Sequence, residues 1–162
     1  MRKAVFLDRD GTINNNKDHY YVWRIEDFEF NPGAIEALRE LKARGYLLVV
    51  ITNQGGVSKG EYNLDDVDIL HHHMSAELER EGIDLDEIYI CPHHDTIEAC
   101  LCRKPLPLMI EKAMARFDID PRRSYMIGDS QRDMEAGIAA GLYSILIDSN
   151  SNLTLVLDQI EL

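Results

Sequence analysis

The sequence predicts an α/β fold in which helices cover both faces of a doubly wound, mainly parallel sheet. Two observations support this prediction. Short apolar runs, typical of buried strands, alternate along the 162 residues with longer segments of helical periodicity. The runs consist mostly of β-branched residues and leucine without polar alternation, as expected for parallel strands buried on both faces. The length fits one domain, and we expect residues 1–162 to form it.

The expected elements follow in order along the chain. The first strand is four apolar residues, 4–7, and it ends at Asp8. The first helix begins at Pro32 and ends before Gly45, because proline suits the first helical turn and glycine the position after the last. The remaining strands are expected at 47–51, 88–90, 125–127 and 144–147, and the remaining helices at 64–81, 108–117 and 132–140. After Asp148 the pattern is ambiguous and compatible with a short final helix.

The charge balance argues against several classes of partner. Lysine and arginine number 17 against 29 acidic residues, which gives a net charge of −12. Such a chain is unsuited to nucleic acid or an anionic membrane. No apolar run approaches the ~20 residues of a membrane span, and the run at 4–7 is too short for a signal peptide. We therefore expect a cytoplasmic protein with a small-molecule partner, and a monomer by default.

Polar residues follow most of the expected strands. In open parallel sheets, ligands bind beyond the carboxyl ends of the strands. Four of the five expected strands lead into acidic, hydrogen-bonding or metal-binding residues, at 8–12, 52–54, 91–94 and 128–130. The chemistry is therefore expected at this edge of the sheet.

A pair of carboxylates after the first strand predicts a magnesium site. Asp8 and Asp10 lie two residues apart, and Gly11 lets the chain turn away sharply. Two carboxylates so close repel each other without a cation, and hard oxygen ligands favour Mg²⁺. Asp129 could supply a third oxygen. Solvated turn residues are the alternative, and for Asp133 a helix N-cap is as good an interpretation as a metal ligand.

Four motifs in register resemble those of the haloacid dehalogenase-like (HAD) phosphatases. They are Asp8–Thr12 (DRDGT), Thr52–Gln54 (TNQ), Arg103–Pro105 (RKP) and Gly128–Asp129 with Asp133. The sequences CPHH at 91–94 and CRKP at 102–105 more narrowly resemble the branch of heptose bisphosphate and histidinol phosphate phosphatases. Neither segment between the motifs is long enough for a large cap domain, so an open site is expected.

The resemblance implies specific roles for these residues. Asp8 would be the nucleophile that forms an aspartyl-phosphate, and Asp10 would protonate the leaving oxygen and then activate water. Mg²⁺ would be bound by Asp8, Asp10 (through its backbone carbonyl) and Asp129. Thr52 and Lys104 would bind the transferred phosphoryl group. The residues counted as catalytic are Asp8, Asp10, Thr52, Arg103 and Lys104.

A polar loop and the second and third motifs are expected to bind the substrate. The sequence DHYY at 18–21 resembles the substrate loop DHGY of the heptose phosphatases, with Tyr20 in place of glycine. Some heptose phosphatases carry lysine where this chain has Ser130, and Arg132 could replace that charge. The expected binding residues are Asp18, His19, Tyr20, Tyr21, Thr52, Asn53, Gln54, Gly55, Arg103, Lys104 and Arg132.

A cysteine and histidine cluster predicts a second metal site. Cys91-x-His93 and Cys100-x-Cys102 provide two pairs of ligands within twelve residues. Three thiolates and one imidazole suit tetrahedral Zn²⁺, and a site closed by four protein ligands is structural. Buried inert cysteines are the alternative. His94 competes with His93, which the resemblance favours. Zinc in the loop 91–102 would position the third motif.

The three consecutive histidines His71–His73 do not indicate a metal site. Neighbouring residues of a helix point about 100° apart, so the three imidazoles cannot share one face. We expect a partly solvated helix face instead.

We expect a Mg²⁺-dependent phosphatase that acts on a small sugar phosphate. The expected substrate is D-glycero-D-manno-heptose 1,7-bisphosphate, which would lose its anomeric phosphate and keep the 7-phosphate on the way to lipopolysaccharide or other heptose-containing glycans. Histidinol phosphate is the alternative substrate. Two alternatives from other classes are a signalling receiver domain and an inactive zinc-stabilised binding module. The third strand leads into Cys91 where a receiver would carry its phospho-acceptor, and the complete acidic set argues against an inactive module.

Overall fold

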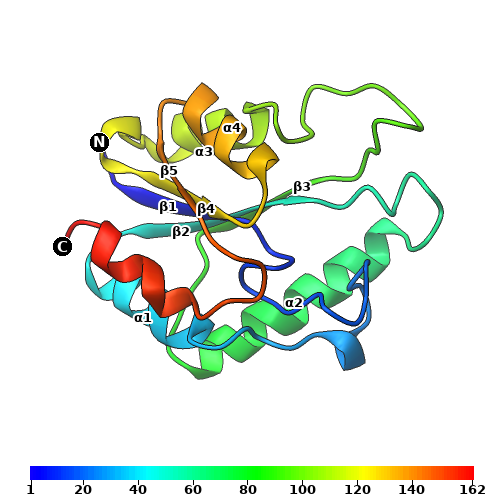
Figure 1. Cartoon of the computed structure of the whole chain (residues 1–162), viewed down its shortest axis with the longest axis horizontal. Coiled ribbons are helices and arrows are strands. Elements are labelled where there is room, and N and C mark those ends of the chain that lie inside the picture. Colours follow the sequence, from blue (N-terminus) through cyan, green and yellow to red (C-terminus); the bar gives the residue numbers. More distant parts are fainter.

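Five parallel strands form the centre of the computed structural model, which describes all 162 residues (Figure 1). The strands lie in the order β3-β2-β1-β4-β5. Their bounds are β1 Ala4–Leu7, β2 Leu47–Asn53, β3 Glu87–Cys91, β4 Tyr125–Gly128 and β5 Tyr143–Leu146. The strand order reverses between β1 and β4, so the point where such sheets bind ligands lies beyond the ends of these two strands.

Helices cover both faces of the sheet. On one face lie α1 (Ala34–Ala43), α2 (Leu64–Arg80) and the 3₁₀ helix η3 (Leu153–Gln159), and on the other lie α3 (Leu108–Phe117) and α4 (Gln131–Ala139) (Figure 1). Short 3₁₀ turns occur at Ile25–Asp27 (η1) and Pro121–Arg123 (η2). No helix combines the length and the apolar character that crossing a membrane requires.

The core consists of two apolar clusters, one on each side of the sheet. Val5 and Leu7 of β1 belong to a cluster of 19 buried residues, which includes Leu38 of α1. The alternate residues of β1, Ala4 and Phe6, belong to a second cluster of 13 residues. Both faces of the strand are buried, which explains why the sequence shows an unbroken apolar run here.

The expected elements are confirmed, with small shifts at their ends. The helix at 108–117 and the strand at 4–7 have the bounds that the sequence predicts. The short final helix is the 3₁₀ helix η3. Two ends matter for the site, because β2 continues through Asn53 and β3 through Cys91. Thr52 and Cys91 therefore lie inside the sheet and pair with Ile90 and Asn53 across the β2–β3 ladder.

Candidate active site

Three carboxylates gather where β1 and β4 end. Asp8 follows β1, Asp129 follows β4, and Asp133 lies in the first turn of α4. One oxygen from each lies within 4.8 Å of the others. Gly11 leaves room for this group, because a Cβ at its position would lie 2.2 Å from Asp129 Oδ2, and its φ of +84° disfavours a side chain. The glycine of the first motif is thus explained by a close approach.

The ammonium group of Lys104 joins two of these carboxylates. Lys104 Nζ lies 2.8 Å from Asp8 Oδ1 and 2.7 Å from Asp133 Oδ1, and it donates to the carbonyl of Ile51 at 2.8 Å. The lysine is 3% exposed, so all three donors are used inside the protein. Its direct partner in this structure is therefore the expected nucleophile.

The carboxylate group and the lysine perturb each other's ionisation. Burial raises the pKa of Asp8 well above its ordinary value, and Asp133 and Asp129 add to this rise while Lys104 opposes it. Burial lowers the pKa of Lys104, but Asp8 and Asp133 outweigh that effect and leave the pKa raised. A further cation beside Asp8 would favour its ionised form, because opposite charges stabilise each other in a buried site.

Asp10 lies outside the group of three and is held by three side chains. The guanidinium of Arg9 donates to Asp10 Oδ1 from Nε at 3.2 Å and from Nη2 at 2.9 Å. Asn14 Nδ2 donates to Oδ1 at 3.0 Å, and Gln54 Nε2 donates to Oδ2 at 3.2 Å. Tyr62 donates to Gln54 Oε1 at 2.5 Å, which fixes the orientation of that amide. Asp10 thus occupies one defined position.

A polar hollow of about 230 Å³ opens above these carboxylates. Most of the side chains expected to act or bind line it. They are Asp8, Asp10, Tyr20, Tyr21, Asn53, Gln54, Gly55, Arg103, Lys104, Asp129 and Arg132. The structure therefore brings together residues from the first motif to the fourth in a single site.

Three expected site residues do not line the hollow. Thr52 is 1% exposed, and its hydroxyl accepts a hydrogen bond from Gln54 Nε2 at 2.8 Å. Asp18 and His19 are exposed on the loop before Tyr20. His19 Nε2 lies 3.3 Å from Asp27 Oδ1, so its nearest charged partner belongs to η1.

Four lining residues were missing from the expected binding set: Asn16, His94, Ser130 and Asp133. Ser130 and Asp133 form the capping box of α4, in which the Ser130 side chain accepts from the Asp133 backbone N–H and the Asp133 side chain accepts from the backbone N–H of Ser130. The spacing S-x-x-D was a signal for this cap. Asp133 therefore takes part in the cap as its third helical residue, while the N-cap itself is Ser130, and its carboxylate also belongs to the acidic group.

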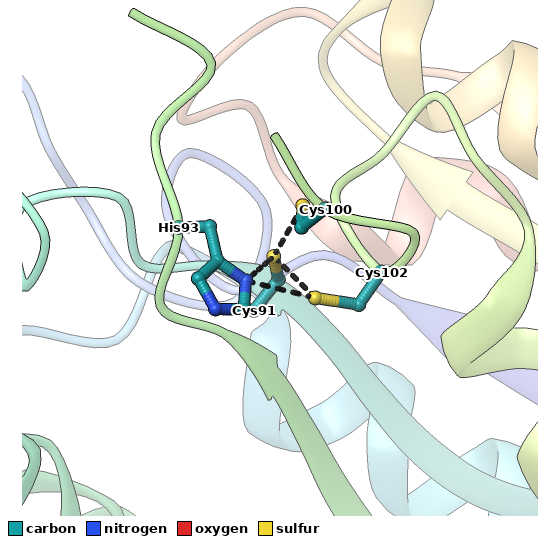
Figure 2. A group of neighbouring side chains, drawn as sticks. All are labelled: Cys91, His93, Cys100 and Cys102. Carbon is teal, nitrogen blue, oxygen red and sulfur yellow. Dashed lines mark hydrogen bonds between the residues drawn. The ribbon is translucent and has the colours of Figure 1, made fainter. Parts of the chain in front are cut away.

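The cysteines and His93 form a cluster beside the hollow, and their side chains point toward one another (Figure 2). Cys91 ends β3, and the other members lie on the loop that follows. Cys91 Sγ lies 3.7 Å from Cys100 Sγ, and His93 Nδ1 lies 3.3 Å from Cys102 Sγ. The four ligand atoms lie within 4.8 Å of one another, which is compatible with tetrahedral zinc. His94 lies in the hollow instead.

The three thiols of the cluster differ in their ionisation. Burial raises the pKa of Cys100, but hydrogen bonds from the backbone N–H groups of Arg103 and Cys102 outweigh it and lower the pKa to about 7. Burial raises the pKa values of Cys91 and Cys102. A zinc ion bound to these sulfurs would stabilise their thiolate form and so lower the pKa values of all three cysteines.

The expectation for the three histidines is wrong for His71. This residue is 8% exposed and lies on the inner face of α2 with Leu70 and Met74. Its Nε2 atom lies 2.9 Å from Nη1 of Arg9. Neighbouring residues of a helix point in different directions, so His71 faces the core while His72 is exposed.

Comparisons with known proteins show the family to which this chain belongs. A family model described as HAD-hydrolase-like matches residues 101–159. The chain is 45% identical over 160 residues to the D-glycero-β-D-manno-heptose-1,7-bisphosphate 7-phosphatase of Pasteurella multocida, covering 95% of this chain and 86% of that one. It is 45% identical over 145 residues to the D-glycero-α-D-manno-heptose-1,7-bisphosphate 7-phosphatase of Campylobacter jejuni, covering 90% and 81%.

A solved structure shares the fold throughout. The D,D-heptose 1,7-bisphosphate phosphatase of B. bronchiseptica, complexed with magnesium and phosphate, superimposes with a TM-score of 0.84 at 32% identity. The match covers 100% of this chain and 88% of that one.

These relatives correct one expectation and support another. The curated relatives are named 7-phosphatases, so the phosphate that they remove is at position 7 and the anomeric phosphate remains. The expected loss of the anomeric phosphate is therefore wrong for these relatives, and motifs shared by the whole superfamily could not have distinguished the two ends of the sugar. Their names favour a heptose substrate over histidinol phosphate.

Proposed function

Because this chain belongs to the D-glycero-D-manno-heptose-1,7-bisphosphate 7-phosphatase family of HAD phosphatases, we propose that it hydrolyses the 7-phosphate of that bisphosphate. The products would be the heptose 1-phosphate and inorganic phosphate, and the sugar would serve lipopolysaccharide or other heptose-containing glycans. The observation that carries the proposal is the group of Asp8, Asp129 and Asp133 in the hollow that Asp10 also lines.

We propose that this acidic group holds Mg²⁺. Its carboxylate oxygens are hard ligands, which Mg²⁺ prefers, and Asp8 and Asp129 directly follow two adjacent strands. Asp8 and Asp129 would bind the ion together with the backbone carbonyl of Asp10. When bound, Mg²⁺ would neutralise charge on the phosphate and so permit the approach of an anionic nucleophile.

The first half of the proposed reaction transfers the phosphoryl group to the protein. A carboxylate oxygen of Asp8 attacks phosphorus, and the bond between phosphorus and O7 of the sugar breaks. The electron pair of that bond goes to O7, which takes a proton from Asp10 and leaves as an alcohol. Lys104 holds the other oxygen of Asp8 at 2.8 Å, so the attacking oxygen is oriented before the substrate arrives.

The second half returns the protein to its starting state. Deprotonated Asp10 takes a proton from water, whose oxygen attacks phosphorus. The bond between phosphorus and Asp8 breaks, and its electron pair returns to the carboxylate. The net reaction consumes one water and releases one phosphate.

We propose that Arg103 and Arg132 bind the phosphate that is not hydrolysed. Both line the hollow, and guanidinium groups recognise phosphate through paired donors. These local cations matter because the net charge of −12 opposes an anionic substrate. Arg132 would supply the charge that lysine provides at position 130 in some heptose phosphatases.

The remaining proposals concern zinc and the state of the chain. Zn²⁺ bound to Cys91, His93, Cys100 and Cys102 would hold the loop that carries the third motif. Free thiols as metal ligands suit the reducing cytoplasm, where we propose that the protein acts. We propose a single domain over residues 1–162, because its four motifs line one hollow, with a monomer as the default state.

The decisive experiment identifies the phosphate that is released. The protein with Mg²⁺ is incubated with each anomer of the heptose bisphosphate, and the product is examined by phosphorus NMR. We expect the anomeric phosphate signal to persist while the 7-phosphate signal is replaced by inorganic phosphate. An Asp8→Asn variant should show no turnover, because it lacks the nucleophile. A product that keeps the 7-phosphate, or a higher kcat/KM for histidinol phosphate, would overturn the assignment.

A further inference from the structure

Arg9 is a buried arginine between the two aspartates of the first motif. The residue is 0% exposed, although arginine is rarely buried without partners. One side of its guanidinium faces Asp10, which accepts from Nε and Nη2. The guanidinium also contacts two other segments of the chain. Nη2 donates to the carbonyl of Val22 at 2.5 Å, and Nη1 lies 2.9 Å from His71 Nε2. The plane of the guanidinium is thus defined from two directions.

His71 must accept a hydrogen bond in this arrangement. A guanidinium has only donors, so Nε2 of His71 carries the lone pair and the ring proton lies on Nδ1. Burial, followed by the charge of Arg9, lowers the pKa of His71 to about 3. The imidazole is therefore neutral throughout the neutral pH range, and its acceptor is always available. The proposed phosphatase reaction assigns no role to His71.

The neighbours of Asp10 show why the guanidinium plane matters. Asn14 and Gln54 also donate to Asp10, at 3.0 Å and 3.2 Å, so the carboxylate would stay in the site if Arg9 moved. Its orientation would change, however, because Arg9 alone contacts both carboxylate oxygens from one rigid group. Proton transfer depends strongly on such orientation.

We propose that His71 is a positioning residue for proton transfer, because its imidazole holds the Arg9 guanidinium in the plane that aims Asp10 at the leaving-group oxygen. The contact joins α2 to the first motif across 62 residues of sequence. The inference rests on the role of Asp10 in the proposed function.

The test compares two leaving groups. Release of the sugar hydroxyl needs a proton from Asp10, whereas p-nitrophenolate leaves without one, so p-nitrophenyl phosphate bypasses the step. The quantity measured is kcat/KM, which covers the steps up to formation of the aspartyl-phosphate. We expect His71→Leu and His71→Asn to lower kcat/KM for the heptose bisphosphate by about 10- to 100-fold, and that for p-nitrophenyl phosphate by less than about 3-fold.

A conservative variant separates positioning from packing. In His71→Gln the amide oxygen reaches the place of Nε2, whereas the side chain of His71→Asn is one bond too short. The glutamine variant should therefore recover most of the kcat/KM for the heptose bisphosphate that the asparagine variant loses. His72→Leu, on the exposed neighbour, is the control and should behave like the parent. Thermal unfolding of each variant accompanies the kinetics, and the Asn and Gln pair decides the matter if the Leu variant does not fold.

Two results would overturn the inference. One is that folded His71→Asn keeps the kcat/KM values of the parent for both substrates. The other is an equal fall for both substrates, which indicates a purely structural role. Asp10→Asn shows whether the premise itself has failed, because that variant must lose activity selectively toward the heptose bisphosphate. If it does so while the His71 variants do not, the role of His71 alone is wrong.

Discussion

At the scale of single residues, Lys104 has the strongest influence on the site. It lies 96 positions from Asp8 in the sequence, yet its ammonium group contacts Asp8 and Asp133 inside the protein. Each of these charges would be costly to bury alone. The lysine therefore makes the acidic group compatible with a folded chain and also orients Asp8, the proposed nucleophile.

Replacing this lysine should destabilise the protein. Lys104→Met leaves Asp8 and Asp133 buried next to each other without a counter-charge, and removing one partner of a buried pair costs about 3–5 kcal/mol. We expect that loss in the free energy of unfolding by urea in magnesium-free buffer. Mg²⁺ should reduce the difference, because it would pair with Asp8, one of the two carboxylates that the lysine neutralises.

The control for this variant is Lys59→Met, at an exposed position, where a change within about 0.5 kcal/mol is expected. A loss below about 1 kcal/mol in Lys104→Met would show that the carboxylates are stable without the lysine.

At the scale of elements, the loop from residue 92 to 107 depends on its ligands. It contains no helix or strand and extends from the carboxyl end of β3 (Figure 1). Several contacts fix it to the sheet, among them the sulfur and histidine cluster and two hydrogen bonds of Lys104, from its backbone N–H to Asn53 Oδ1 at 3.0 Å and from Nζ to the carbonyl of Ile51 at 2.8 Å. The third motif is thus positioned by contacts rather than by regular structure.

Removing zinc should loosen this loop and reduce activity. The purified protein should contain about one zinc per chain, and a zinc-selective chelator in excess Mg²⁺ should speed amide hydrogen exchange in residues 92–106. The kcat/KM should fall, because Lys104 would no longer be held beside Asp8. Exchange in α4 serves as the internal control. A metal-free protein with unchanged exchange in the loop would contradict the zinc site.

At the scale of the whole molecule, the sheet couples the two halves of the core. Neighbouring residues of β1 belong to the two opposite clusters. Because both clusters share the same strands, disrupting one of them also disturbs the other. The last helix, η3, buries Leu153 and Val156 against the same cluster as α1 and closes that face. Such an arrangement favours cooperative unfolding.

We therefore expect thermal unfolding of the zinc-loaded protein in a single step. Far-ultraviolet circular dichroism and the fluorescence of Trp23, the only tryptophan, should give one midpoint. The calorimetric enthalpy should equal the van't Hoff enthalpy, on the order of 100 kcal/mol for a chain of this length. Two separate transitions would show that the chain contains more than one folding unit.

The fold and much of the site could be predicted from the sequence because their signals are local. The apolar run at 4–7 and the helical pattern at 108–117 depend on neighbouring residues only, and both match the structure. Asp8 and Asp129 follow from the rule that parallel strands end at one edge. Spacing and the family resemblance single out Cys91, His93, Cys100 and Cys102, and the structure brings these four side chains together.

What only the tertiary structure decided were the contacts between distant residues. Lys104 meets Asp8, and His71 meets Arg9, because the parallel order of the strands and the packing of α2 bring these segments together. Thr52 does not line the hollow, and its hydroxyl bonds instead to the side chain of Gln54. Periodicity and spacing report what each segment can form, whereas these pairings depend on which segments become neighbours when the apolar faces are buried.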